Sequence, residues 1–359
     1  MTENLRTSEN SVGKLAPITG ILYILFSFAI ILTSFGIIPS SNTSTVLTSG
    51  MLGTLFIAFF YYAFLMSLGE NGNKGALLVI PPVVFAAVVG FALSNTEVAL
   101  FSIIEVLSAT LTSAVLYNGA YKKALRSDVC SHAAFVLLVF SILEITIMLF
   151  LISSANNISM TTLLFDTTER FIKDYSAVYM ELLEKAVSGG AVGAADLAIS
   201  MEYIEAEITS VIALLPAILF IVYFCFAFVF TYIADALTKR LGILPEYRFG
   251  RYEVSTTVNV LFNIFGIIVI LSTFFEENVS AFSIGMLSVV LTLLPHYIIL
   301  GLRRLFVMLR KRLTVLASII VSLLIVFVGL YLFSTILILV IVMFGTTEYR
   351  LSKHGSAVK

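Results

Sequence analysis

The chain alternates long apolar runs with short polar loops, and one long polar interval interrupts this pattern near the middle. About 20 consecutive apolar residues are enough for a helix to cross the hydrocarbon core of a bilayer. Nine runs approach or exceed this length, covering residues 16–38, 47–68, 76–93, 98–116, 133–153, 209–237, 255–275, 281–302 and 313–344. The pattern predicts an all-α fold, a polytopic transmembrane helical bundle of about nine spans.

The polar interval, residues 154–208, has apolar positions at helical spacing and carries nine acidic residues against three basic ones. Asp166 and Glu169 have the spacing of a capping box, Gly189–Gly190 is a helix stop, and Asp196 can cap a second helix. We therefore expect an amphipathic helical hairpin outside the membrane. It either lies on the bilayer surface and packs on itself, or binds a partner protein.

This hairpin divides the chain into five expected parts. They are a cytoplasmic tail (1–15), a five-span N-terminal bundle (16–153), the acidic hairpin (154–208), a C-terminal bundle of four spans (209–344) and a basic tail (345–359). The last apolar run is long, because 32 helical residues would measure about 48 Å. One tilted helix, or a hairpin bent near Gly329, fits this length, so the count is nine or ten spans.

Composition and the distribution of charge give the class and the orientation. The chain is 59% hydrophobic and only 12% charged, which excludes an ordinary soluble domain. Lys and Arg gather in the loops at 122–126, 239–251 and 303–312, whereas alternate loops contain none. The positive-inside rule then places the N-terminus in the cytoplasm and the hairpin on the opposite side. The same rule places the basic tail in the cytoplasm, which favours the bend near Gly329.

Motifs for enzymatic chemistry are absent from the sequence. It contains no phosphate-binding loop, no H-E-x-x-H, no G-x-S-x-G and no paired-cysteine metal spacing, and it has only three histidines. We therefore expect no catalytic residue, no cofactor and no metal. The basic stretch 303–312 lies beside a span, where it is typical of a topology anchor or an anionic-lipid contact rather than of nucleic-acid binding.

The candidate functional residues are polar groups inside the apolar runs. Glu105 and Glu144 lie within two runs, where a carboxylate is costly unless it is protonated, paired or facing water. Asn259 and Asn263 lie one helical turn apart in another run, and His296 lies in the run after it. Either the two carboxyls are neutral and hydrogen-bonded to neighbouring helices, or these residues form an intramembrane polar site for a substrate, a cation or a proton.

Four short segments carry a family resemblance: Tyr121-Lys122-Lys123, Leu214–Ala217, Lys239–Pro245 and the ending Gly345–Arg350. Together with the acidic insert, their order resembles the YybS-like family of uncharacterised bacterial multi-pass membrane proteins. The resemblance implies a bacterial cell membrane but no assigned function. The N-terminal half is also similar, in fold only, to the substrate-binding subunits of energy-coupling-factor transporters.

Two classes of function follow from these features. The polar residues within spans favour a small-molecule binding or transport component. The hairpin and the basic loops favour a non-transporting envelope scaffold or sensor that acts through protein partners. In both cases the expected surroundings are a lipid bilayer, and no nucleic-acid partner is expected. A membrane-embedded enzyme ranks third, because the sequence shows no catalytic constellation.

Overall fold

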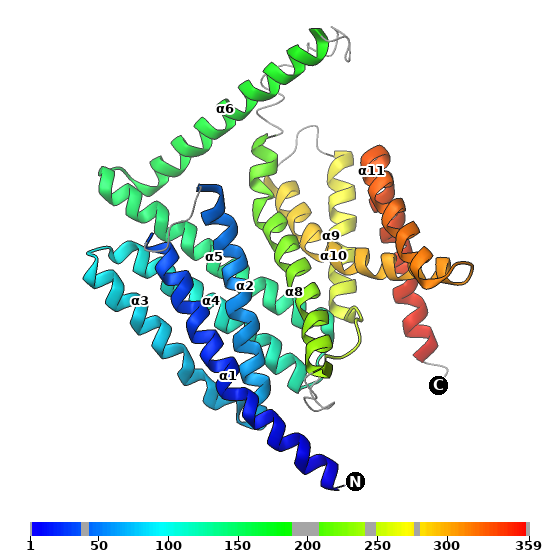
Figure 1. The fold of residues 1–359 in the computed structure, drawn as a ribbon. Coiled ribbons are helices and arrows are strands. Elements are labelled where there is room, and N and C mark those ends of the chain that lie inside the picture. Colours follow the sequence, from blue (N-terminus) through cyan, green and yellow to red (C-terminus); the bar gives the residue numbers. More distant parts are fainter. Residues whose placement is uncertain (1, 37–42, 189–207, 241–248, 276–280, 357–359) are drawn as a thin grey trace. The chain divides into compact units, whose positions relative to one another are not determined.

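The computed structural model describes residues 2–36, 43–188, 208–240, 249–275 and 281–356, and these residues form helices joined by turns (Figure 1). The N-terminal elements are α1 (Thr2–Ser34), α2 (Thr43–Leu68), the 3-10 helix η1 (Gly69–Val79), α3 (Ile80–Ala92), α4 (Thr96–Tyr121) and α5 (Arg126–Asn156). The later elements are α6 (Met160–Ser188), α8 (Leu215–Arg240), α9 (Thr256–Phe275), α10 (Ala281–Arg310) and α11 (Val315–Ser356). The described part contains no strand, so the all-α prediction is confirmed.

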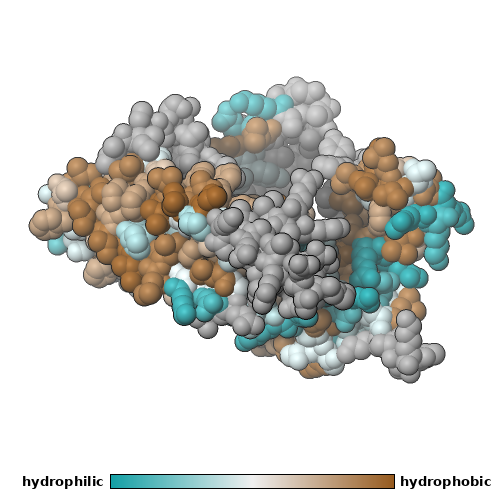
Figure 2. Space-filling model, turned by 60° about the horizontal axis from the view of Figure 1, so that its bottom comes forward, coloured by the Kyte–Doolittle hydropathy of each residue, from teal (hydrophilic) through white to brown (hydrophobic). Residues whose placement is uncertain are grey.

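Six segments among the described residues are long and apolar enough to cross a membrane. They are Ala16–Ser34, Lys74–Ala92, Thr96–Tyr121, Arg126–Asn156, Leu215–Ala236 and Phe282–Arg310. Figure 2 shows broad hydrophobic areas on the surface, as expected where lipid chains replace water. Three other expected spans coincide with helices whose described apolar stretches are shorter, at 56–68, 256–272 and 315–326. The structure thus supports an integral membrane protein, while the count of nine stays a prediction.

The chain forms two compact units, each assembled from separate segments. Unit 1 consists of Met1–Asn118, Phe135–Pro216 and Ala236–Tyr247, and unit 2 of Gly119–Ala134, Ala217–Asp235 and Arg248–Lys359. Both α5 and α8 contribute residues to the two units. Segments from both sides of the polar interval therefore meet within each unit. The orientation in the membrane and the five-part division stay predictions.

Unit 1 is organised by aromatic packing between α1 and α2. The ring centroids of Tyr23 and Tyr61 lie 4.9 Å apart, and those of Phe26 and Phe60 lie 4.8 Å apart. The turn into η1 needs a left-handed backbone at Gly69, whose φ is 56°. A glycine adopts this conformation without steric cost, so the chain can reverse there.

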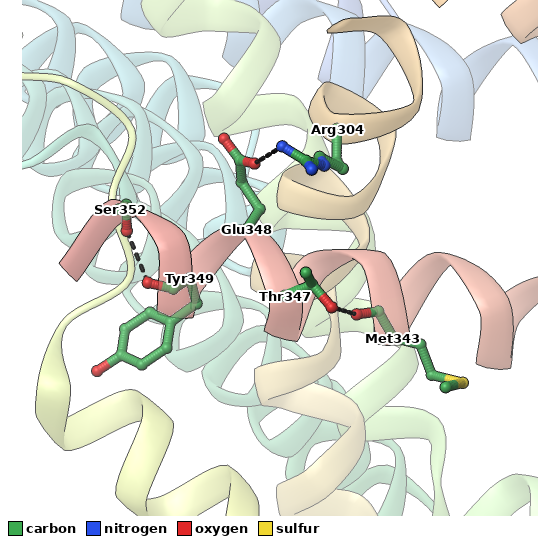
Figure 3. A network of polar contacts seen from close by, with 6 residues as sticks. All are labelled: Arg304, Met343, Thr347, Glu348, Tyr349 and Ser352. Atoms are coloured by element: carbon green, nitrogen blue, oxygen red, sulfur yellow. Dashed lines mark hydrogen bonds and ion pairs between the residues drawn. The ribbon is translucent and has the colours of Figure 1, made fainter. Parts of the chain in front are cut away.

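Unit 2 is organised by a close crossing of α10 and α11. A Cβ added to Gly301 would lie 2.0 Å from the carbonyl oxygen of Ile341, and one added to Gly345 would lie 2.1 Å from that of Tyr297. Only glycine permits this approach of two helix backbones. Beyond the crossing, Arg304 forms an ion pair with Glu348 at 3.4 Å (Figure 3).

The last apolar run differs from the hairpin expectation. Residues 315–356 form the single helix α11, without a bend at Gly329 that reverses the chain. A glycine inside a helix costs only about 1 kcal/mol relative to alanine, and no proline interrupts the run. The hairpin prediction is therefore wrong, and the alternative of one long helix is correct.

The first helix of the polar interval begins earlier than the sequence pattern indicates. α6 starts at Met160, and the Ser159 hydroxyl caps it by accepting a hydrogen bond from the Thr162 N–H at 3.0 Å. Asp166 lies inside the helix, so its capping-box prediction is wrong: Ser159 caps the helix about two turns upstream. Gly189–Gly190 and the expected second helix from Asp196 to residue 207 lie outside the described residues.

Candidate functional site

A buried arginine stands at the start of α5. Arg126 is 8% exposed and forms an ion pair with Asp235 of α8. Its guanidinium carbon lies 4.0 Å from the centre of the Tyr232 ring and 5.8 Å from that of Phe249. A buried cation is tolerated when a carboxylate and aromatic faces compensate for the lost water. The arrangement holds one positive charge rigidly inside unit 2.

The extended segment 249–255 lies against the turn that precedes α5. The Gly250 N–H donates to the carbonyl of Ala124 at 2.8 Å, and the Arg126 N–H donates to the carbonyl of Arg251 at 3.3 Å. A Cβ on Gly250 would lie 2.7 Å from the Ala124 oxygen, so this contact requires glycine. The two hydrogen bonds hold the backbone of Gly250 and Arg251 against the start of α5.

A chain of hydrogen bonds fixes the same segment to α5 and α10. The Tyr252 hydroxyl lies 3.2 Å from His296 Nδ1, and His296 Nε2 lies 3.1 Å from Ser131 Oγ. Ser131 donates to the carbonyl of Ser127 at 3.0 Å, and the Ser127 hydroxyl donates to the carbonyl of Glu253. Burial raises the pKa of the Tyr252 phenol, so it remains a donor. Every bond is satisfied if neutral His296 accepts at Nδ1 and donates at Nε2.

These elements form an open pocket of about 780 Å³ within unit 2. Its wall consists of Arg126, Phe228, Tyr232, Phe249, Gly250, Arg251, Tyr252, Ile299, Leu302, Arg303, Phe306, Ile319, Ser322, Leu323 and Val326. Three of these described lining residues are arginines, and none of the lining residues is acidic. Asp235 pairs with Arg126, so the three guanidiniums and this carboxylate leave a net charge of about +2.

Two polar atoms at the pocket are buried without a hydrogen-bond partner in the described part of the chain. They are Nε of Arg126 and Oγ of Ser322. Arg303 extends from α10 and donates to the Tyr252 carbonyl at 3.5 Å, while Arg251 and Arg303 are otherwise exposed. Guanidinium groups recognise oxyanions through several N–H donors at once. The pocket is therefore suited to a small anion with an apolar part.

No protein-family model, curated protein or solved structure matches this chain.

The described residues also limit the kinds of chemistry that the site can support. No group of three or more His, Cys, Asp or Glu side chains in the described ranges could hold a metal ion. The described side chains that line the pocket offer donors and apolar surface, and the Ser131–His296 pair is not among them. Binding of an anion is a chemistry that these lining residues support.

The sequence-predicted carboxyls both belong to unit 1. Glu105 lies on α4 and is half-buried, and its Oε1 accepts a hydrogen bond from the Thr54 hydroxyl of α2 at 2.9 Å. Glu144 lies on α5 and is also half-buried. The contact of Glu105 is the kind expected when a carboxyl is hydrogen-bonded to a neighbouring helix.

The other three predicted site residues belong to unit 2. The Asn263 amide donates to the carbonyl of Asn259 at 2.7 Å, and Asn259 Oδ1 accepts from the Tyr297 hydroxyl at 2.7 Å. His296 takes part in the hydrogen-bond chain described above. None of the three lines the arginine pocket. A cavity that they share with Glu105 or Glu144 stays a prediction.

The sequence pattern indicates a role in topology for the arginines of the pocket, and for Arg303 either a topology anchor or an anionic-lipid contact. Arg126 and Asp235 are 109 residues apart, so their pairing is invisible in any local pattern. A usable signal was nevertheless present. Tyr232 and Asp235 lie one helical turn apart at the end of an apolar run, and aromatic residues alternate with Arg in the segment 247–252.

Proposed function

We propose that this protein is the small-molecule-binding component of a membrane system and that the arginine pocket of unit 2 binds an anionic ligand. The observation that carries the proposal is that the buried Arg126 lines one pocket together with Arg251 and Arg303. A cluster of like charges is unfavourable to folding, because each guanidinium repels the next. An anionic ligand offsets this cost, and a function in binding gives a reason for the cluster.

The physical properties of the pocket fit a ligand of modest size. Its volume of about 780 Å³ lies within the range of about 300–1,000 Å³ that small-molecule sites occupy. The apolar wall lowers the local dielectric, which strengthens the attraction between a guanidinium and an oxyanion. The hydrogen-bond chain through Tyr252 and His296 holds the wall in place, so little ordering is needed when the ligand binds.

The side of the membrane, the bacterial cell-membrane location and the similarity to the YybS-like family remain parts of this proposal. If the positive-inside orientation is correct, the pocket faces the cytoplasm, because Arg251 and Arg303 lie in segments expected on that side. Binding at such a site serves either a transporter or a receptor.

A second candidate function, an envelope scaffold or sensor, rests on α6. This helix exposes Phe171, Tyr175, Val178 and Leu182, each more than half exposed and spaced four, three and four residues apart. A stripe with this spacing is typical of a surface that packs on a protein or a lipid interface. Deleting residues 160–207 should leave ligand binding intact if the pocket alone provides the function.

The proposal is tested by identifying the compounds that co-purify with the protein. The protein is extracted and purified in a neutral detergent. It is then denatured, and the small molecules that it releases are analysed by mass spectrometry. We expect an anionic compound with the wild type and a loss of most of it with Arg303→Gln. The matched control, Arg310→Gln, removes the same charge from the same helix outside the pocket and should retain the compound.

A wild-type extract without an anionic compound, in a preparation that also fails to bind added phosphate esters, contradicts the proposal. So does equal recovery from the Arg303 and Arg310 variants. Two further variants, Arg251→Gln and the charge-neutral pair Arg126→Gln with Asp235→Asn, extend the test to the other two arginines.

A further inference from the structure

We infer, resting on the proposed function, that the ligand is an amphiphile with a phosphate monoester head group and a hydrocarbon chain. The arginine cluster and the apolar wall of α10 and α11 lie in one pocket, and each matches one part of such a molecule. Phosphoryl oxygens would contact Arg126, Arg251 and Arg303, and the chain would lie along the helices.

The positive charge of the pocket and its guanidinium N–H donors favour a phosphate monoester head group. The three guanidiniums and Asp235 leave about two uncompensated positive charges at the pocket. A phosphate monoester carries about −1.5 to −2 charges at neutral pH and three terminal oxygens that accept several hydrogen bonds. A carboxylate carries one charge and two oxygens, so it would leave one guanidinium without a counter-charge. The buried Nε of Arg126, which has no hydrogen-bond partner among the described residues, offers a further donor.

The apolar residues on the rest of the pocket wall favour a ligand with a hydrocarbon chain. Two helix faces supply apolar side chains at helical spacing. They are Ile299, Leu302 and Phe306 on α10, and Ile319, Leu323 and Val326 on α11. An inorganic anion makes no use of such a wall. Leu323 is 54% exposed and Ile319 is 43% exposed, so the wall continues from the pocket onto the outer surface of α11. A chain that begins at the arginines can therefore extend along α11 into surrounding lipid.

Two sources share this chemistry: a two-chain membrane phospholipid with a terminal phosphate, and a single-chain alkyl or isoprenoid phosphate. The probes for the test are inorganic phosphate, the monoesters butyl, hexyl and octyl phosphate, octanoate, octanol, and dihexanoyl phosphatidic acid. Dissociation constants are measured by equilibrium dialysis with the full chain in a bilayer disc of zwitterionic lipid, at fixed ionic strength.

We expect the affinity for alkyl phosphates to rise with chain length, by up to about fourfold for each methylene that the pocket buries. Octanoate should bind at least about tenfold more weakly than octyl phosphate, because it loses charge-assisted hydrogen bonds. Octanol should not bind measurably. Preference for octyl phosphate or for dihexanoyl phosphatidic acid identifies the source, and either preference supports the inference.

Two matched pairs of variants locate the contacts. Arg303→Gln should weaken octyl phosphate binding at least about tenfold, whereas Arg310→Gln should leave it within about twofold. Leu323→Trp fills the pocket and should abolish the dependence on chain length. Leu324→Trp is the control, since Leu324 is 59% exposed but does not line the pocket.

The outcomes distinguish a failure of the amphiphile inference from a failure of the proposed anion pocket. If inorganic phosphate or octanoate binds as tightly as octyl phosphate and Arg303→Gln abolishes that binding, the amphiphile is wrong and the anion pocket stands. If octanol binds like octyl phosphate and Arg303→Gln changes nothing, the affinity is hydrophobic partitioning, and both proposals fail. If no probe binds, in a preparation that carries no co-purified anion, both proposals also fail.

Discussion

Removing the carboxylate of Asp235 should destabilise the protein by leaving Arg126 charged and without its counter-ion. The Arg126 side chain is 10% exposed and that of Asp235 is 25% exposed, so the pair is largely but not fully removed from water. Breaking a fully buried ion pair at one partner costs about 3–5 kcal/mol. Here, water reaches part of Asp235, and the Tyr232 ring at 4.0 Å still stabilises the cation by about 1–2 kcal/mol. We therefore expect Asp235→Asn to cost about 2–3 kcal/mol.

The double variant Arg126→Gln with Asp235→Asn separates this cause from a loss of packing. It places two neutral amides where the charges were, and we expect its stability to return to within about 1 kcal/mol of wild type. Glu253→Gln is the charge control, because the Glu253 side chain is exposed, and it should change stability by less than about 0.5 kcal/mol.

The free energy of unfolding is measured by titrating the protein in neutral detergent with a denaturing detergent and following helix content by circular dichroism. The reasoning is refuted if Asp235→Asn is as stable as wild type, or if the double variant is no more stable than Asp235→Asn. Either result would mean that Arg126 is not a buried cation that depends on this carboxylate.

Three further predictions use the same measurement. Gly301→Ala should cost about 1–3 kcal/mol by pushing α11 away from α10. Gly285→Ala on the same helix should be neutral or slightly stabilising, because its added Cβ meets nothing within 4 Å. Equal effects would contradict the close crossing. Burial raises the folded-state pKa of the Tyr252 phenol, so ionisation above a pH of about 10 favours the unfolded chain and lowers the free energy of unfolding. Tyr252→Phe should therefore make the free energy of unfolding fall less steeply above this pH. An unchanged pH slope would contradict this. Glu105→Gln, which keeps an acceptor for Thr54, should stay within about 0.5 kcal/mol of wild type, whereas Glu105→Leu should cost about 1–2 kcal/mol; two variants of equal stability would show that the hydrogen bond contributes nothing.

Local patterns were sufficient for the class of fold and for most helices. Apolar runs of about 20 residues must form helices in lipid, because every backbone polar group has to be satisfied within the segment. The same logic was insufficient where two helical solutions had similar energies. At Gly329, a bend and a continuous helix differ by little in propensity, and packing against α10 through Gly345 and Ile341 is absent from any one-dimensional pattern.

The sequence by itself determined that this is a helical membrane protein with polar groups inside its spans, because hydrophobicity and helical period are properties of neighbouring residues. Only the tertiary structure decided that Arg126, Arg251 and Arg303 line one pocket of unit 2, and that Asp235 forms an ion pair with Arg126. Such a pocket depends on long-range pairing: Gly250 must approach Ala124, and Tyr252 must reach His296, before the arginines share a wall. Long-range contacts of this kind have no signature in local composition. This is the physical reason why the sequence pattern indicates a role in topology for these arginines, whereas the fold shows that they line one pocket.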